Sequence, residues 1–264
     1  MKTYLINLSR RPDRLSAMTE QFMSLGIPFE RIDAIDARTT PDAEIDARFS
    51  DNGPLGPLPK GDKCCTLSHE RAWAAFIASG EPYAMIMEDD VEISPDAAPL
   101  LTDTNWIPVE VGLLKVERFG PEHQRVLVGD TVDLPNGHRI GKLHSRHTGG
   151  GAYILSRATA QKLFDPRRVW TLPVDHALFN PNNSPLFDAL EPYQLMPVIA
   201  RQSVVLGGTT DIDEWRTKFR RMTFGLLRRK AIRAYYDVRL LPRQLVSLML
   251  GRGKLVRVEQ PRPH

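Results

Sequence analysis

Residues 3–35, TYLINLSRRPDRLSAMTEQFMSLGIPFERIDAI, have the pattern of a strand, a helix and a second strand. The first strand is predicted at Thr3–Leu8, and Pro12 suits the first turn of the helix that follows. Gly26 is a natural end for this helix, and Phe29–Ile35 has the pattern of the second strand. The apolar residues of the helix recur at helical spacing: Leu15, Met18, Phe22 and Leu25. A β-α-β unit of this kind predicts the beginning of a parallel sheet.

The chain continues with the same alternation of helical and strand patterns. Residues 51–61, DNGPLGPLPKG, hold three glycines and three prolines and therefore predict a loop. The remaining predicted elements are a helix at 62–79, strands at 83–87, 111–116 and 151–155, and a helix at 157–164. We therefore expect an α/β sandwich with a mostly parallel central sheet, extending to about residue 210.

Three carboxylates, Glu88, Asp89 and Asp90, directly follow the apolar strand Tyr83–Met87, and we call them the acidic triplet. They are expected at the carboxyl edge of the sheet, where open α/β sheets bind ligands. Because like charges repel and carboxylate oxygens are preferred ligands of hard divalent cations, the triplet predicts a bound cation. Such a cation would bridge a diphosphate and stabilise the charge of a departing nucleotide. The alternative is a solvated turn whose acids cap the next element.

The formal net charge of +3 is unevenly divided along the 264 residues. Residues 216–264 hold fourteen Lys or Arg and two acids, whereas the preceding residues hold 21 basic and 30 acidic side chains. In residues 215–250 the basic side chains alternate with Phe, Leu, Ile and Tyr at near-helical spacing, which predicts a basic amphipathic helix. Such a helix binds an anionic membrane surface. The alternative is a helix that packs its apolar side on the main domain, while the acidic body argues against nucleic-acid binding.

We therefore divide the chain into a main domain, 1–210, and a basic helical extension, 211–264. The two cysteines, Cys64 and Cys65, are adjacent, and a disulfide between neighbours would strain the backbone, so both are predicted to be free thiols. A chain with so little cysteine fits a reducing compartment. The N-terminal residues MKTYLINLSRRPDR show no signal peptide or membrane span. We expect a cytoplasmic protein that is peripheral on the inner face of the cytoplasmic membrane.

Six motifs in the same order resemble the family 25 glycosyltransferases, which include lipooligosaccharide galactosyltransferases and the collagen galactosyltransferases. Each motif alone is a weak signal, and the series covers about residues 3–205. The motifs are YLINLSRRPDR at 4–14, GIPFERIDAID at 26–36, KGDKCCTLSHERAW at 60–73, EPYAMIMEDDVEI at 81–93, HTGGGAYILSR at 147–157 and LPVDHALF at 172–179.

The resemblance implies a GT-A-like, Rossmann-like fold that binds a nucleotide sugar. It implies a UDP-sugar donor, often UDP-galactose, and a divalent metal such as Mn²⁺. It also implies inversion at the anomeric carbon and a β-linked product on a glycan or glycolipid acceptor such as lipooligosaccharide or lipopolysaccharide.

Several residues are candidates for binding the donor and the metal. Each also has a structural alternative: a turn cap for Asn7, a solvated face for the arginines, a loop cap for the aspartates that follow the second strand, a helix-packing role for the Ser-His pair and a bulge for the glycines. The metal candidates are Asp89 and Asp90. The donor-binding candidates are Asn7, Arg10, Arg14, Asp36, Ser68, His69, Asp89, Gly149 and Gly150, with Asp33 and Gly151 beside them.

An inverting transfer needs a general base that deprotonates the acceptor hydroxyl. Asp175 is the first candidate because it follows a proline and lies far from the acidic triplet in sequence, and its alternative is a helix N-cap. Glu88 is the second candidate. His144 and His147 could supply a metal ligand, although lone loop histidines are usually surface residues.

Two other functions share these sequence features. A metal-dependent nucleotidyl- or phosphate-ester-transfer enzyme would also need an acidic triplet. A non-catalytic scaffold with a glycosyltransferase-like fold would need only the fold, and the intact acidic triplet argues against it.

Overall fold

The computed structural model describes residues 1–120, 123–134, 137–203, 234–236 and 238–259. The strands are β1 (Lys2–Asn7), β2 (Glu30–Asp33), β3 (Tyr83–Glu88), β4 (Val91–Ile93), β5 (Leu113–Lys115), β6 (Glu117–Arg118), β7 (Arg125–Asp133), β8 (Arg139–Leu143), β9 (Ala152–Ser156), β10 (Tyr193–Met196), β11 (Ala200–Gln202) and β12 (Lys254–Arg257). The helices are α1 (Pro12–Leu25), α2 (Asp42–Asp46), α3 (Lys60–Ser79), α4 (Ala97–Thr102), α5 (Arg157–Leu163), α6 (Val174–Phe179), α7 (Phe187–Leu190) and α11 (Leu241–Met249).

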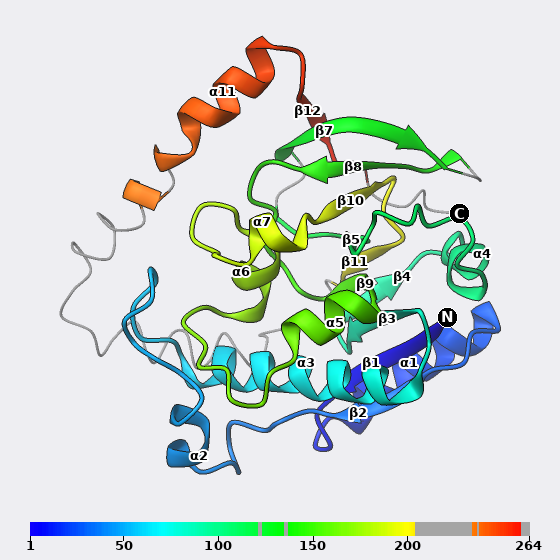
Figure 1. Ribbon diagram of the computed structural model, residues 1–264. Helices are drawn as coiled ribbons and strands as arrows, with labels where there is room; N and C mark the ends of the chain where they lie inside the picture. Colours follow the sequence, from blue (N-terminus) through cyan, green and yellow to red (C-terminus); the bar gives the residue numbers. More distant parts are fainter. Residues whose placement is uncertain (121–122, 135–136, 204–233, 237, 260–264) are drawn as a thin grey trace.

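The N-terminal β-α-β unit is confirmed (Figure 1). Helix α1 begins at Pro12 and ends at Gly26, whose φ of 65° is the left-handed conformation that glycine adopts without strain. Strand β1 pairs in parallel with both β2 and β3, so that Ile6 lies opposite Ile32 on one side and Glu88 on the other. The parallel pairing brings the carboxyl ends of all three strands to the same edge of the sheet.

Hydrophobic side chains cover both faces of the sheet. On β1, Tyr4 and Ile6 pack into one cluster with residues of α3, α5 and α6, while Leu5 packs into a second cluster with residues of α1 and α4. Because successive side chains of a strand point to opposite faces, a strand buried on both faces has an uninterrupted apolar sequence. The result is the expected α/β sandwich, with helices on both sides of the sheet (Figure 1).

Within the described residues, the large sheet has nine strands in the order β12-β7-β8-β10-β5-β9-β3-β1-β2. The prediction of a mostly parallel sheet holds for β2, β1 and β3 and for the β10–β5 pair. The other five pairs are antiparallel, so the sheet is mixed. One of these pairs, β7–β8, is a hairpin, which joins antiparallel neighbours without a crossover helix.

A second sheet of three strands, β4-β11-β6, begins directly after the acidic triplet. Ala200 on β11 lies opposite Ile93 on β4 and Glu117 on β6. This small sheet therefore places Glu117 close to the triplet, although about thirty residues separate them in sequence.

The described part of the C-terminal region departs from a purely helical extension. Strand β12 pairs with β7 and forms an edge of the large sheet, and Val198 N donates to Glu259 O at 3.2 Å. Residues 254–257 therefore belong to the same sheet as the main domain. Helix α11 lies within the predicted helix 215–250, most of which lies outside the described residues. Among the helices that the structure describes, none is both long enough and apolar enough to cross a membrane.

Candidate functional site

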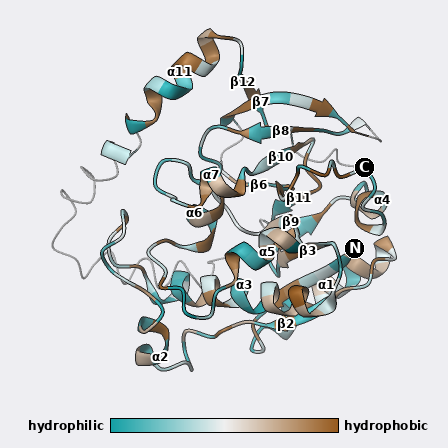
Figure 2. Ribbon diagram, viewed as in Figure 1, coloured by the Kyte–Doolittle hydropathy of each residue, from teal (hydrophilic) through white to brown (hydrophobic). Residues whose placement is uncertain are grey.

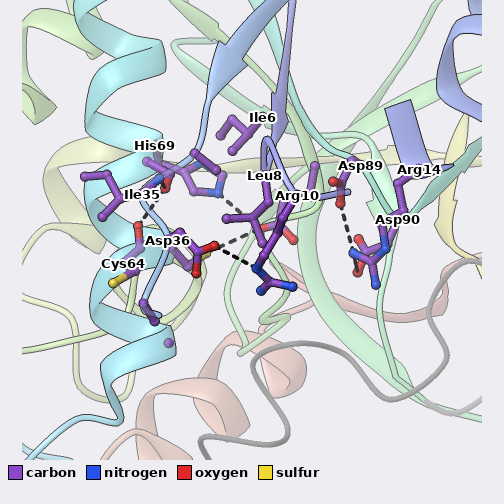
Figure 3. Close-up of a pocket in the computed structure, with 16 residues that line it drawn as sticks. Ile6, Leu8, Arg10, Arg14, Ile35, Asp36, Cys64, His69, Asp89 and Asp90 are labelled. Atoms are coloured by element: carbon purple, nitrogen blue, oxygen red, sulfur yellow. Dashed lines mark hydrogen bonds and ion pairs between the residues drawn. The ribbon is translucent and has the colours of Figure 1, made fainter. Parts of the chain in front are cut away.

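The acidic triplet lies where β3 ends, at the edge of a pocket formed by the ends of β1, β2 and β3 and by α3 (Figure 3). We call it the acidic pocket. Its lining includes eight residues that the sequence singled out: Arg10, Arg14, Asp36, Ser68, His69, Glu88, Asp89 and Asp90. Four segments that are far apart in sequence thus meet at the carboxyl edge of the sheet, as expected for an open α/β sheet.

Asp89 is held by two hydrogen-bond donors within the protein. Asn7 Nδ2 donates to one carboxylate oxygen at 2.7 Å. Arg14 Nη1 donates to the other at 2.9 Å (Figure 3). Burial raises the pKa of the Asp89 carboxyl, and Arg14 and Asn7 act in the opposite direction. Both oxygens of Asp89 are therefore already engaged, which makes this residue an anchor of the triplet.

Asp90 is held far less completely. Asp90 is only 6% exposed, and its Oδ2 lies 3.7 Å from Arg14 Nη1. Its Oδ1 is buried and has no hydrogen-bond partner among the described residues. Burial and the charge of Glu88 raise the pKa of Asp90 from 3.8 to about 7. An ionised carboxylate with an unpartnered oxygen is costly in such a place, and a cation in the pocket would relieve that cost.

Glu88 faces the side of α3. Its Oε1 lies 3.1 Å from His69 Nε2 and 3.5 Å from Cys65 Sγ. The His69 ring is fully buried, stacks on Tyr153 and places Nδ1 2.8 Å from the Tyr153 hydroxyl. The helical Ser-His pair of the sequence therefore includes a histidine that contacts the triplet directly.

A second ion pair lies at the mouth of the pocket. Arg10 Nε donates to Asp36 Oδ2 at 2.7 Å, and both side chains are partly exposed (Figure 3). Asp36 also accepts a hydrogen bond from its neighbour's backbone at Arg38 N. Arg10 and Asp36 thus line the pocket as predicted, whereas Asp33 is not among its lining residues and pairs with Ser9 and Arg31.

Next to the triplet lies a buried ion pair that the sequence analysis did not single out. Lys115 Nζ lies 2.7 Å from Glu117 Oε1, donates to Gly149 O and sits 4.7 Å from the centre of the Phe179 ring. Burial lowers the pKa of Lys115 and raises the pKa of Glu117. Glu117 also accepts from Gly151 N at 2.9 Å, so the pair fixes the glycine-rich loop.

Two of the three glycines are required by contacts within the chain itself. Gly149 has a φ of +101°, and a Cβ there would lie 2.6 Å from Phe119 Cβ. A Cβ on Gly151 would lie 2.7 Å from Glu117 Oε2, whereas one on Gly150 would only reach ordinary contact with Asp175 at 3.7 Å. The sequence leaves a donor contact and a structural bulge open for these glycines. Tight packing of the loop explains Gly149 and Gly151, whereas Gly150 lies next to Asp175.

Asp175 lies in the first turn of α6, and Pro173 occupies the N-cap position, so the N-cap alternative for Asp175 is wrong. Its Oδ2 accepts from Gly149 N at 3.3 Å and its Oδ1 from His176 N at 2.8 Å. The charges of Asp175 and Glu88 both act on the buried groups Cys65 and Lys115. The two candidate bases, Asp175 and Glu88, therefore lie near the same buried groups, Cys65 and Lys115.

Two candidate donor-binding residues are used internally instead. Asn7 is 1% exposed, is not among the lining residues of the acidic pocket, and accepts from Arg31 Nε while it donates to Asp89. Ser68 Oγ donates to Cys64 O and accepts from Ile35 N, which ties α3 to the segment after β2. Both side chains position the pocket, because their polar atoms already have partners.

The two loop histidines do not meet the acidic triplet as metal ligands. His147 is buried, with Nδ1 2.7 Å from Gln194 Oε1 and Nε2 accepting from Phe119 N, and burial lowers its pKa to about 3. His144 lies in a different pocket, beside α11. The expectation that they are surface residues is wrong for His147, because its imidazole is part of the polar network around Glu117.

A sequence signal for the missed ion pair does exist. Lys115 interrupts the apolar run 111–116, and a charge inside a buried strand requires a buried partner. Glu117, two residues along and on the same face of the chain, is the obvious partner. By contrast, no pattern in the sequence relates Cys65 to Glu88, because their contact depends on how α3 packs against β3.

The acidic pocket fits a hard divalent cation. Asp90 Oδ1 offers a buried carboxylate oxygen without a partner among the described residues, and Glu88 lies next to it. Oxygen ligands of this kind suit Mg²⁺ or Mn²⁺. Asp89, one of the two predicted metal ligands, is bound to Asn7 and Arg14, so Asp90 is the better placed of the two.

Comparisons with known proteins agree on one family. The model of glycosyltransferase family 25, described as an LPS biosynthesis protein, matches residues 1–178. The lacto-N-neotetraose biosynthesis glycosyltransferase LgtB of Neisseria gonorrhoeae is 26% identical over 226 residues, which cover 77% of this chain and 75% of LgtB. LgtE of Neisseria meningitidis serogroup B, described in the same words, is 25% identical and covers 99% of this chain and 94% of its own.

The lipooligosaccharide biosynthesis protein lic2B of Haemophilus influenzae is 28% identical over 168 residues, which cover 61% of each chain. The matched region of the family model includes β1, the acidic triplet, the glycine-rich loop and Asp175. The chain belongs to glycosyltransferase family 25.

Proposed function

We propose that this chain transfers a hexosyl group, galactose in the first instance, from a UDP-sugar to a hydroxyl group of a lipooligosaccharide or lipopolysaccharide glycan. Family membership supports the reaction class, and the names of the relatives support the acceptor class. The observation that carries the proposal is Asp90 Oδ1, a buried carboxylate oxygen that has no hydrogen-bond partner among the described residues, at a pocket on the carboxyl edge of the sheet. We further propose the GT-A type of nucleotide-sugar binding for this fold.

On the donor side, we assign the diphosphate to the region between Arg10 and Asp90. Arg10 is partly exposed at the pocket mouth and can turn from Asp36 to a phosphate, which arginine binds with paired hydrogen bonds. Arg14 stays with Asp89 and keeps the triplet in place. Asp90, with Glu88 beside it, would hold a Mn²⁺ ion, which would supply positive charge to stabilise the departing UDP.

On the acceptor side, an inverting transfer requires one proton to leave the attacking hydroxyl. We assign Asp175 as the base: its carboxylate takes the proton while the hydroxyl oxygen forms the bond to the anomeric carbon and the bond to the UDP oxygen breaks. The amide of Gly149 holds one oxygen of Asp175, which fixes the carboxylate. Glu88 is the second candidate, although its contacts with His69 and Cys65 in the acidic pocket favour a role on the donor side.

A panel of UDP-sugars tests this proposal. We expect manganese-dependent release of UDP from one of them, strongest in the presence of a lipooligosaccharide acceptor, and loss of that release in Asp90→Asn. Asp130→Asn is the matched control because Asp130 is an exposed acid on β7. Equal release by the Asp90 variant and the wild type would refute the role assigned to the triplet.

We also propose that the C-terminal region binds an anionic membrane surface, which would bring the enzyme to a lipid-linked acceptor on the inner face of the cytoplasmic membrane. On α11, Leu241, Leu245 and Met249 recur at a spacing of one helical turn and are 44%, 56% and 86% exposed. Figure 2 shows hydrophobic (brown) segments next to hydrophilic (teal) ones along α11. An exposed apolar stripe beside basic residues favours an anionic membrane.

Replacement of Leu241, Leu245 and Met249 by serine should weaken binding to vesicles that contain anionic lipid. Val109→Ser is the control, because Val109 is 95% exposed but lies elsewhere in the fold. Unchanged vesicle binding by the triple variant would contradict the proposal.

A further inference from the structure

Three side chains with metal-binding atoms converge on the α3 side of the acidic pocket. Cys65 Sγ, His69 Nε2 and a Glu88 carboxylate oxygen all lie within 4.8 Å of one another. Cys65 and His69 are four residues apart on α3, which places them on the same face of the helix one turn apart. We call these three residues the thiol cluster.

The spacing of the three atoms suits a tetrahedral cation. Ligands at the usual zinc distances of about 2.3 Å for sulfur and about 2.0–2.1 Å for nitrogen and oxygen are separated by roughly 3.3–3.6 Å from one another. In the structure Glu88 Oε1 lies 3.5 Å from Cys65 Sγ and 3.1 Å from His69 Nε2. Small side-chain shifts therefore suffice for a cation to sit between the three atoms.

The surroundings of the cluster are also those of a metal site. His69 Nδ1 lies 2.8 Å from the Tyr153 hydroxyl, which also accepts from Trp73 Nε1 at 2.8 Å. Metal-bound histidines usually make such a contact through the second ring nitrogen, because it fixes the orientation of the ring. All three residues line the acidic pocket, so a cation has a path of entry.

We propose that the thiol cluster binds a thiophilic divalent cation, Zn²⁺ in the cell, at a site distinct from the oxygen-ligand site at Asp90. On binding, the Cys65 thiol releases its proton to solvent as the sulfur–metal bond forms, and Nε2 of His69 faces the cation while its proton resides on Nδ1. A thiolate and a carboxylate together carry two negative charges, which match one divalent cation. Sulfur and imidazole ligands select zinc over manganese or magnesium.

One consequence rests on the proposed function: zinc at this site holds Glu88, which adjoins the manganese site, so zinc should inhibit sugar transfer. The binding itself does not depend on that function. The primary test therefore measures binding alone, and its failure would leave the proposed transferase unaffected.

Cadmium serves as the probe, because a cadmium–thiolate bond gives a charge-transfer absorption band in the ultraviolet. We expect titration of the full-length protein with Cd²⁺ to produce this band with a single tight site. Cys65→Ala should lose the band and weaken Cd²⁺ binding at least about tenfold, as removal of a metal-site partner does. His69→Gln should weaken binding while the cysteine is intact.

Cys64→Ala is the matched control. Cys64 is the neighbouring thiol, but it packs with Ala37, Ile45 and Leu67 and is not part of the cluster. It should therefore keep both the band and the affinity. Circular dichroism checks the fold of each variant, and Cys65→Ser, which preserves the size of the side chain, replaces the alanine variant if that does not fold.

The proposal is overturned if the wild type shows no cadmium–thiolate band. It is equally overturned if the band persists in both Cys65 variants, or if Cys64→Ala removes it while Cys65→Ala does not.

Discussion

Asp90→Asn should stabilise the metal-free protein and at the same time abolish its response to manganese. The side chain is buried at the edge of the acidic pocket, and burial together with the charge of Glu88 raises its pKa from 3.8 to about 7. One pKa unit corresponds to about 1.4 kcal/mol. An ionised Asp90 therefore lowers the free energy of unfolding by up to about 4 kcal/mol relative to a neutral side chain of the same shape.

The raised pKa fixes the pH window of this effect. Well below pH 3.8 the carboxyl is protonated in both the folded and the unfolded chain, so it contributes nothing to the pH dependence. Between the unfolded value of 3.8 and the folded value of about 7, the unfolded chain ionises while the folded protein keeps its proton. Stability therefore falls as the pH rises through this window, and the loss is complete above about pH 7.

Urea unfolding followed by circular dichroism, in the presence of a chelator, measures this difference. The asparagine variant should match the wild type at acid pH and exceed its free energy of unfolding by up to about 4 kcal/mol at about pH 8. Asp130→Asn, the exposed control, should stay within about 0.5 kcal/mol of the wild type at every pH.

Manganese should narrow the difference between the two proteins. A ligand at a hundred times its Kd stabilises the folded state by about 2.7 kcal/mol, and this gain requires the Asp90 carboxylate. Below about pH 7 protons compete for that carboxylate, so the manganese affinity of the wild type should fall about tenfold per pH unit. The reasoning is refuted if Asp90→Asn is no more stable than the wild type above about pH 7, or if manganese stabilises both equally.

Three further predictions concern the polar network beside the triplet. Gly151→Ala should cost about 1–3 kcal/mol in urea unfolding because the new Cβ would meet Glu117, whereas Gly150→Ala should be neutral or stabilising by up to about 1 kcal/mol. Glu117→Gln should cost about 3–5 kcal/mol, since it leaves Lys115 buried without its carboxylate, and a smaller loss would argue against a charged pair. Asp175→Asn should lower kcat by roughly 10²–10⁴ with little change in donor affinity measured by calorimetry, and an unchanged kcat would move the role of base elsewhere.

The first half of the fold could be predicted from local patterns. Strand β1, helix α1 with its end at Gly26, and the strand before the triplet all follow from apolar spacing and glycine or proline positions. The hairpin β7–β8 and the edge strand β12 were not predicted. Strand β12 pairs with β7 across more than a hundred residues, and such pairing leaves no local trace in either segment.

The sequence predicts which residues form the candidate site, but it does not predict the role of each residue. The residue types predict Asp89 and Asp90 alike as metal ligands. Only the three-dimensional contacts distinguish their roles, because Asn7 and Arg14 donate hydrogen bonds to both carboxylate oxygens of Asp89. The sequence likewise predicts a nucleotide contact for Asn7, because an asparagine at a strand end suits either a ligand or a neighbouring carboxylate. The amino-acid sequence alone does not show whether a ligand or a carboxylate lies within hydrogen-bond distance of Asn7.

Manganese titration in the presence of UDP tests the central assignment most directly. The electron paramagnetic resonance signal of free Mn²⁺ decreases as the ion binds, so the signal reports occupancy without any turnover. We expect wild-type protein to bind Mn²⁺ more tightly when UDP is present. Asp90→Asn should show no measurable Mn²⁺ binding without UDP, and UDP should not increase its affinity. Equal manganese binding by the two proteins would contradict the account of the acidic triplet.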